Sequence, residues 1–206
     1  MPRIFDISKP IPSSMDACTV FADTNAIVDL FYDQGGLIPN SRVSDKAPYH
    51  AFIGALWTSG KNLHISALVV MEMYGVFQKY DKHIFNSSRP KGSKVDDIKV
   101  FRSQFQDRAD CKRRYGLITQ QLATNPHIVI EPVALSDGEI VSYVDKMDIH
   151  TMDTNDYILT TMLSTENQVI LTDDGDFCFP NAAYDIATNN RKLINMALSI
   201  GYTMAN

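Results

Sequence analysis

The chain has 206 residues, of which 45% are hydrophobic and 21% are charged, and its formal net charge is −5. This composition is typical of one soluble globular domain with a full core, and no apolar run approaches the roughly 20 residues that span a bilayer. The first residues lack the apolar region of a signal peptide, and the three cysteines lie far apart, so we expect a cytoplasmic protein without a disulfide framework or a zinc site.

Strands and helices are predicted to alternate along the chain. Short apolar runs between turn residues predict strands, and amphipathic stretches predict helices. Residues 1–17 contain three prolines and little periodicity, so we expect an irregular segment there. In chain order, the predicted elements are a strand at 19–22, helices at 26–32 and 49–59, a strand at 63–65, helices at 67–79 and 95–123, a strand at 128–130, helices at 137–146 and 156–163, strands at 169–172 and 184–187, and a helix at 192–200.

Capping residues support several helix starts. Thr24 or Asn25 can cap the first predicted helix, and Ser66 can cap the third. Ser136 and Glu139 have the spacing of a capping box before the fifth.

The alternation of strands and helices predicts the α/β class, with a central, mostly parallel sheet and helices on both faces. In such sheets the site lies outside the carboxyl ends of the strands. Asp23 and Asp174 each follow a predicted strand directly. We therefore expect these two carboxylates to meet.

A basic segment interrupts this pattern. Residues 79–114 contain eleven Lys and Arg and five Asp, a net charge of +6, and the rest of the chain carries −11. An enzyme that acts on a polyanion could use such a segment to bind it. A solvated helix surface is an equally good interpretation of the charge run alone.

Acidic side chains recur at the ends of the predicted elements. Asp23 lies in Phe21-Ala22-Asp23-Thr24-Asn25, where it could also be a helix cap. Asp153 and Asp156 precede an apolar helix. We expect Asp153 to be its cap, and either acid could be the functional one of the pair.

Two further sites are harder to explain as ordinary surface. Glu72 is the only charged residue in the apolar stretch 67–77, where a buried carboxylate needs a partner and a rim position is the alternative. Asp173, Asp174 and Asp176 form the turn Thr-Asp-Asp-Gly-Asp-Phe after a predicted strand. One acid in such a turn is common, but three in four residues are a stronger signal.

Carboxylates gathered at one edge of a sheet repel one another. At a separation of about 4 Å each pair costs on the order of 1 kcal/mol in water and about 4 kcal/mol at a partly shielded site. A bound hard cation removes this cost, and carboxylate oxygens suit Mg²⁺ or Mn²⁺. The pattern predicts a site for one or two such ions.

In this order, the acidic segments resemble the PIN-domain family of metal-dependent ribonucleases. The matching pieces are Phe21-Ala22-Asp23-Thr24-Asn25, Ser66-Ala67-Leu68-Val69-Val70-Met71-Glu72-Met73, Asp156-Tyr157-Ile158-Leu159-Thr160-Thr161 and Ile170-Leu171-Thr172-Asp173-Asp174-Gly175-Asp176-Phe177.

The resemblance implies roles for individual residues. The catalytic metal ligands would be Asp23, Glu72, Asp156 and Asp174, with Asp176 as an additional ligand. Thr172 resembles the family's small hydroxyl residue beside the site. The supporting residues would be Thr24, Asn25, Thr172, Asp153 and Asp173.

The resemblance also implies a fold, a three-layer α/β/α domain. A single domain over 1–206 would have its core at 17–77 and 128–206. Residues 78–127 would form a basic, mostly helical insertion, which is where this chain departs from compact family members. From this insertion we assign six residues to RNA binding: Lys94, Arg102, Arg108, Lys112, Arg113 and Arg114.

The implied function is an Mg²⁺- or Mn²⁺-dependent endoribonuclease that hydrolyses RNA phosphodiester bonds. The toxin of a toxin–antitoxin module is the expected role, with an antitoxin protein and a homodimer as family expectations. A processing or defence nuclease without an antitoxin is the other role.

Two alternatives belong to other classes. A non-catalytic RNA- or protein-binding module could use a PIN-like fold. A haloacid-dehalogenase-like phosphatase also has Asp after its first strand, but it needs a second Asp two residues later. Asn25 occupies that position here, which argues against the phosphatase.

Overall fold

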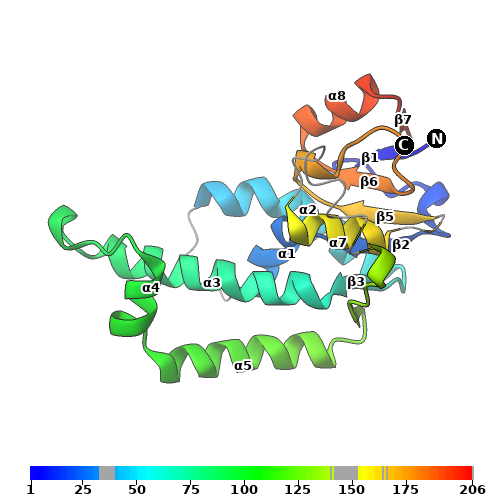
Figure 1. The fold of residues 1–206 in the computed structure, drawn as a ribbon. Coiled ribbons are helices and arrows are strands. Elements are labelled where there is room, and N and C mark those ends of the chain that lie inside the picture. The colour runs from blue at the N-terminus through cyan, green and yellow to red at the C-terminus, as the bar shows by residue number, and fades with distance from the viewer. Residues whose placement is uncertain (33–39, 140, 142–152, 164, 166, 206) are drawn as a thin grey trace.

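A computed structural model describes residues 1–32, 40–139, 141, 153–163, 165 and 167–205, and for residues 40–45 it describes the backbone alone. Seven parallel strands form the central sheet, with helices on both faces (Figure 1). The strands are β1 (Arg3–Asp6), β2 (Thr19–Ala22), β3 (Leu63–Ser66), β4 (Ile128–Glu131), β5 (Gln168–Leu171), β6 (Asp185–Thr188) and β7 (Thr203–Met204). The predicted α/β class and three-layer α/β/α arrangement are confirmed.

The sheet order is β4-β3-β2-β5-β6-β1-β7, and each described pair of neighbours is parallel. The prediction of an irregular segment at 1–17 is wrong for its first part, because β1 pairs with β6 on one side and β7 on the other. Ile4 and Phe5 are buried there. Prolines flank this short strand without interrupting it. Its four residues are too few to show the alternation of polar and apolar side chains that would predict a strand. β7 is shorter still and was not predicted.

The helices are α1 (Thr24–Phe31), α2 (Asn40–Thr58), α3 (Ala67–Ser87), α4 (Ile98–Val100), α5 (Arg108–Thr124), α7 (Thr154–Met162) and α8 (Arg191–Ser199). Short 3₁₀ turns occupy Ser13–Met15, Lys91–Ser93 and Gly175–Phe177. Ser66 caps α3 by accepting from the amide of Val69, as predicted. The capping box is confirmed, because Glu139 Oε2 accepts from the Ser136 amide and the Glu139 amide donates to Ser136 Oγ. Most of predicted helix 137–146 lies outside the described residues.

Three helix predictions need correction. Helix 49–59 already begins at Asn40, nine residues before its predicted start, and it continues through Pro48. Helix 67–79 continues to Ser87, so the predicted insertion boundary at residue 78 falls inside α3. Helix 95–123 is broken into α4, a π-helical turn at Phe101–Phe105, and α5. The physical reason is a second cap, because the Asp107 carboxylate accepts from the amides of Ala109 and Asp110 and starts a new helix.

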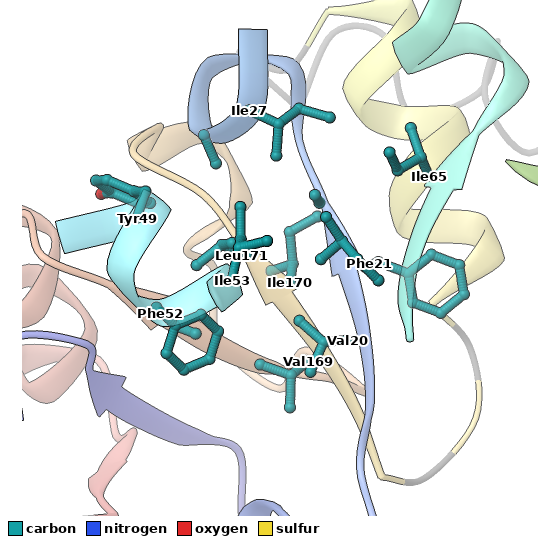
Figure 2. Close-up of a cluster of buried hydrophobic side chains, with 14 of the residues drawn as sticks. Val20, Phe21, Ile27, Tyr49, Phe52, Ile53, Ile65, Val169, Ile170 and Leu171 are labelled. Atoms are coloured by element: carbon teal, nitrogen blue, oxygen red, sulfur yellow. The ribbon is translucent and has the colours of Figure 1, made fainter. Parts of the chain in front are cut away.

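α2 forms one wall of the core. Side chains alternate between the two faces of a strand, so Val169 and Leu171 of β5 point to the same face. Tyr49, Phe52 and Ile53 of α2 lie over them (Figure 2), and all five side chains are at most 4% exposed. This packing fixes the position of Tyr49 close to the carboxyl end of β5.

α3 and α5 form an arm that extends away from the sheet, with the two helices side by side (Figure 1). Aromatic rings join them, since the Tyr115 ring lies 5.4 Å from that of Tyr74 and 5.9 Å from that of Phe77. The Asp81 carboxylate is buried between the helices and accepts from Tyr115 Oη at 2.7 Å and pairs with Arg114 at 2.8 Å. The basic segment is therefore anchored to the core by a buried polar cluster.

The strand order reverses beside β2. From β2 the chain moves to β3 and β4 toward one edge, whereas β5 and β6 lie on the other side of β2. In open α/β sheets, ligands bind outside the carboxyl ends of the strands at such a switch point. Ala22 and Leu171 are aligned partners at the ends of β2 and β5. The residues that follow them, beginning with Asp23 and Thr172, therefore occupy this crevice.

Candidate metal centre

Asp23 leaves the end of β2 and is 3% exposed. Its amide donates to the Leu171 carbonyl at 3.0 Å, which continues the pairing of β2 with β5 by one residue. Its side chain makes no capping hydrogen bond to α1, although the residue occupies the N-cap position. The carboxylate instead accepts from Thr172 Oγ1 at 3.1 Å. The predicted cap at Thr24 or Asn25 is wrong, because α1 already begins at Thr24.

Glu72 lies on the second turn of α3 and is partly buried. The Thr24 hydroxyl donates to its Oε2 at 2.8 Å. Thr24 directly follows Asp23 and is the first residue of α1, so this bond joins α3 to the start of α1. Glu72 thus faces the strand ends.

Asp153 and Asp156 take different roles. Asp153 caps α7, as predicted, by accepting from the amides of Asn155 and Asp156. Asp156 is partly buried, and its pKa is raised to about 8, first by burial. The carboxylates that raise this pKa further are those of Asp153, Asp23, Asp174 and Glu72. Asp156 is therefore the member of the pair that faces the other acids.

The turn after β5 is held by hydroxyl and amide groups. Thr172 Oγ1 accepts from the amide of Asp174 at 3.0 Å while it donates to Asp23. Asp174 accepts from the amide of Asp176 at 3.0 Å and from Asn25 Nδ2 at 3.5 Å. Asp176 is exposed, and its pKa is raised by slight burial and by the charge of Asp174 and then that of Asp153. It lies at the rim of the site.

Four carboxylates lie around this point, those of Asp23, Glu72, Asp156 and Asp174, and the charges of the others raise the pKa of Asp156. We call these four residues the acid cluster. The pKa of Asp23 is raised to about 7, first by burial and then by the charges of Glu72 and Asp174, while the hydrogen bond from Thr172 works in the opposite direction. The four side chains come from the residue after β2, from α3, from α7 and from the turn after β5, which are far apart in the sequence.

The donor chemistry of the acid cluster fits a hard divalent cation, since it consists of carboxylate oxygens. The rise in the pKa values of Asp23 and Asp156 reflects partly buried negative charges that a cation would neutralise. Within the described residues, no group of three His, Cys, Asp or Glu side chains is gathered closely enough to hold a metal ion in its present conformation. One oxygen each of Asp23 and Glu72 is bonded to a threonine hydroxyl. Because the carboxylates are too far apart in this conformation, metal binding would require the side chains of the acid cluster to move closer together.

Tyr49 and Lys46 are supporting residues that sequence reasoning missed. Tyr49 Oη lies 3.1 Å from both Asp173 Oδ1 and Thr188 Oγ1. Lys46 Nζ pairs with Asp173 Oδ2 at 2.9 Å. Asp173 therefore fastens the turn to α2, and Tyr49 joins α2 to β6. Lys46 lies before the predicted helix 49–59, and a tyrosine at the start of that helix gives no sequence signal for this role.

The residues assigned to RNA binding lie away from the acid cluster. α4 and the start of α5 are at the end of the arm that is remote from the strands (Figure 1). Five of the six are exposed: Lys94, Arg102, Arg108, Lys112 and Arg113. Arg113 also pairs with Asp110 at 2.7 Å.

Arg114 differs from the other five. It pairs with Asp81 at 2.8 Å and with Asp110 at 3.0 Å, and it donates to Tyr32 Oη at 3.5 Å. These contacts give Arg114 a structural role, which its place in a run of three cations does not predict.

Within the described residues, no helix has the length and apolar character needed to cross a membrane. A comparison with models of known protein families gave no match, and a comparison with curated proteins gave none either. The resemblance to the PIN-domain family therefore stays a prediction that rests on four motifs.

Proposed function

We propose that this protein is a metal-dependent endoribonuclease that hydrolyses RNA phosphodiester bonds. The observation that carries the proposal is the placement of the four acids of the cluster around the switch point of the sheet, where hydrogen bonds from Thr24 and Thr172 hold the carboxylates of Glu72 and Asp23. A perturbed pair of pKa values in a crevice is typical of a functional site. The order of the acids along the chain and their PIN-like motifs favour a nuclease over other metal enzymes.

Asp23, Glu72, Asp156 and Asp174 would hold one or two Mg²⁺ or Mn²⁺ ions, with Asp176 at the rim. A bound ion would supply a water of lowered pKa and would stabilise the negative charge on the leaving oxygen. Thr24 and Thr172 would orient the carboxylates of Glu72 and Asp23 through the hydrogen bonds described above. Asp153 would fix the start of α7 and with it the position of Asp156.

The exposed cations of the arm would contact RNA phosphates. Phosphate contacts do not depend on the identity of the base, so this part of the RNA affinity would be salt-dependent and largely independent of sequence. The residues that would make these contacts are Lys94, Arg102, Arg108, Lys112 and Arg113. Because they lie away from the acid cluster, they would bind the strand at some distance from the cleaved bond.

The biological role that we propose is that of a toxin in a toxin–antitoxin module of the cytoplasm. The support is the family resemblance, from which an antitoxin partner and a homodimer follow as expectations. Co-purification of the chain with the product of an adjacent small gene, together with growth arrest when the chain is expressed alone, would test this role. Neither result would be expected of a processing nuclease.

Cleavage of end-labelled single-stranded RNA tests the activity. Purified protein would be assayed with Mg²⁺, Mn²⁺ or EDTA, beside the variants Asp23→Asn and Asp16→Asn. Asp16 is a matched control, because its side chain is 71% exposed and it precedes β2 at the opposite end of the strand. We expect metal-dependent cleavage that is lost in Asp23→Asn alone. RNA binding without cleavage by any of the proteins would instead support the binding module.

A further inference from the structure

A groove of about 400 Å³ adjoins the acid cluster between α1, α2, α3 and the turn after β5. Asp174, a member of the acid cluster, lines this groove together with Asn25, and Val28, Val76 and Tyr80 form the apolar part of its wall. Asn25 Nδ2 and Asp174 Oδ2 lie 3.5 Å apart, so the groove begins where the acid cluster ends. A molecule seated in it would be continuous with one bound at the cluster.

The apolar part of the groove wall suits a flat, partly apolar group. Val28 and Val76 contribute aliphatic surface, and Tyr80 contributes its ring. The Tyr80 ring is held in place by an edge contact with Tyr32, with the ring centroids 5.2 Å apart. Because this wall is fixed by the core, it is ready to pack against an aromatic ligand.

The polar part of the groove is acidic. Asp29, Asp173 and Asp174 line it, and Lys46 is the one cation among the described residues of its lining. The Lys46 ammonium is already paired with Asp173 at 2.9 Å. The groove therefore favours a ligand that presents N–H donors and disfavours a phosphate within it.

The volume and the chemistry identify the class of ligand. Small-molecule pockets begin at about 300 Å³, so this groove admits one nucleobase with part of its sugar. Unpaired RNA bases are bound by packing on their faces and by hydrogen bonds to their edges. Adenine, cytosine and guanine carry exocyclic amino groups, and uracil has none.

We propose, on the basis of the ribonuclease function above, that this groove receives one unpaired base of the RNA strand whose phosphodiester lies at the acid cluster, and that it prefers amino-bearing bases to uracil. The face of the base packs on Val28, Val76 and Tyr80. Its amino group donates to the carboxylates of the polar part, among which Asp29 is 5% exposed and fixed by a 2.9 Å hydrogen bond from Tyr80 Oη.

Nuclear magnetic resonance separates this proposal from the question of cleavage. Isotope-labelled protein would be titrated in EDTA with the trinucleotides AAA, CCC and UUU, so that no turnover is needed. We expect amide shifts that centre on Asn25, Val76, Tyr80 and Gly175, with binding of UUU at least about threefold weaker, as for the loss of one hydrogen bond. Shifts elsewhere, or equal affinity for all three, would overturn the proposal.

Two variants and a control variant sharpen the test. Val76→Phe fills the groove and should abolish the shifts at Asn25 and Gly175, whereas Ile130→Phe on the exposed end of β4 should leave them unchanged. Asp29→Asn should reduce the preference for AAA and CCC over UUU. A protein that cleaves RNA but shows no groove shifts retains the proposed function and loses this inference. Groove shifts in a protein that cleaves no RNA would support base binding in the groove and would contradict the proposed ribonuclease function.

Discussion

The Thr24 hydroxyl donates a 2.8 Å hydrogen bond to Oε2 of Glu72, which is 48 positions away in the sequence. Thr24 is 1% exposed, so water does not compete for its hydroxyl. The bond fixes one carboxylate oxygen of Glu72 and leaves the other for a ligand. It links α1 to α3 at the point where the acid cluster is assembled.

Removal of this hydroxyl should weaken the metal centre. We expect Thr24→Val to lower metal affinity or the cleavage rate by about 10- to 100-fold, which is the usual effect of removing a partner that orients a metal ligand. Thr24→Ser keeps the hydroxyl and should stay near the wild-type rate. Cleavage rates measured over a range of Mn²⁺ concentrations would show the loss as a shift to higher concentration. Equal rates for the Val and Ser variants would show that Thr24 does not position Glu72.

Thr172 is the second positioning hydroxyl, and its loss should also lower stability. It is fully buried, donates to Asp23 and accepts from the Asp174 amide. Thr172→Val has a similar shape but leaves both partners without this hydroxyl, at a cost of about 1–3 kcal/mol. Urea unfolding of Thr172→Val beside the exposed control Thr203→Val would measure the difference. A change below about 0.5 kcal/mol in Thr172→Val would contradict this account of the turn.

Acid unfolding should depend on Asp81. Burial alone would raise its pKa, but hydrogen bonds from Arg114, Tyr115 and Tyr32 outweigh burial and hold the pKa below the usual range of an aspartate. Because the folded-state pKa lies below the unfolded-state pKa of about 4, Asp81 contributes stability that is complete above that pH. This contribution is lost as the pH falls through the folded-state pKa.

The variant Asp81→Asn tests this linkage. It leaves Arg114 without its buried partner, so we expect the free energy of unfolding near pH 7 to fall by about 3 kcal/mol. The variant should also lose less stability than the wild type between pH 5 and pH 2, because one linked proton has been removed. Chemical unfolding at several pH values would measure both effects. Parallel pH profiles for the two proteins would exclude Asp81 as a source of the acid sensitivity.

RNA affinity should depend on salt through the exposed cations of the arm. The variant that replaces Arg108, Lys112 and Arg113 with Gln omits Arg114, whose loss would disturb the fold. On single-stranded RNA each lost phosphate contact should reduce the slope of log affinity against log salt by about 0.7, so the triple variant should lose about 2. Filter binding at several salt concentrations would measure the slope. The control replaces Lys9 and Lys192, and a slope that changes no more in the triple variant than in this control would assign RNA binding to another surface.

The strand-to-helix turns could be predicted because their signals are local. Val169 to Leu171 form a short apolar run that ends in an acidic turn, and Asp153 precedes its helix by one residue, so neighbouring residues alone predict the strand and the cap. The meeting of the ends of β2 and β5 followed from the rule for open α/β sheets rather than from either segment.

Other features depend on contacts between distant residues and had no local signal. β1 is a strand because it pairs with β6 and β7. These partners are distant in the sequence, since Arg3 of β1 and its ion-pair partner Asp185 of β6 are 182 positions apart. Tyr49 reaches Asp173 only because α2 packs on β5. Arg114 is indistinguishable in the sequence from Lys112 and Arg113, and only the buried carboxylate of Asp81 makes its role structural.

Direct measurement of metal binding tests the central claim. Purified protein would be titrated with Mn²⁺ while the free ion is followed by electron paramagnetic resonance, beside the variants Asp23→Asn, Asp156→Asn and the control Asp16→Asn. The account predicts that one or two Mn²⁺ ions bind to the wild type and to the control and that both cluster variants lose most of this binding. Binding that is absent from all four proteins, or equal in all of them, would contradict a metal centre at the acid cluster.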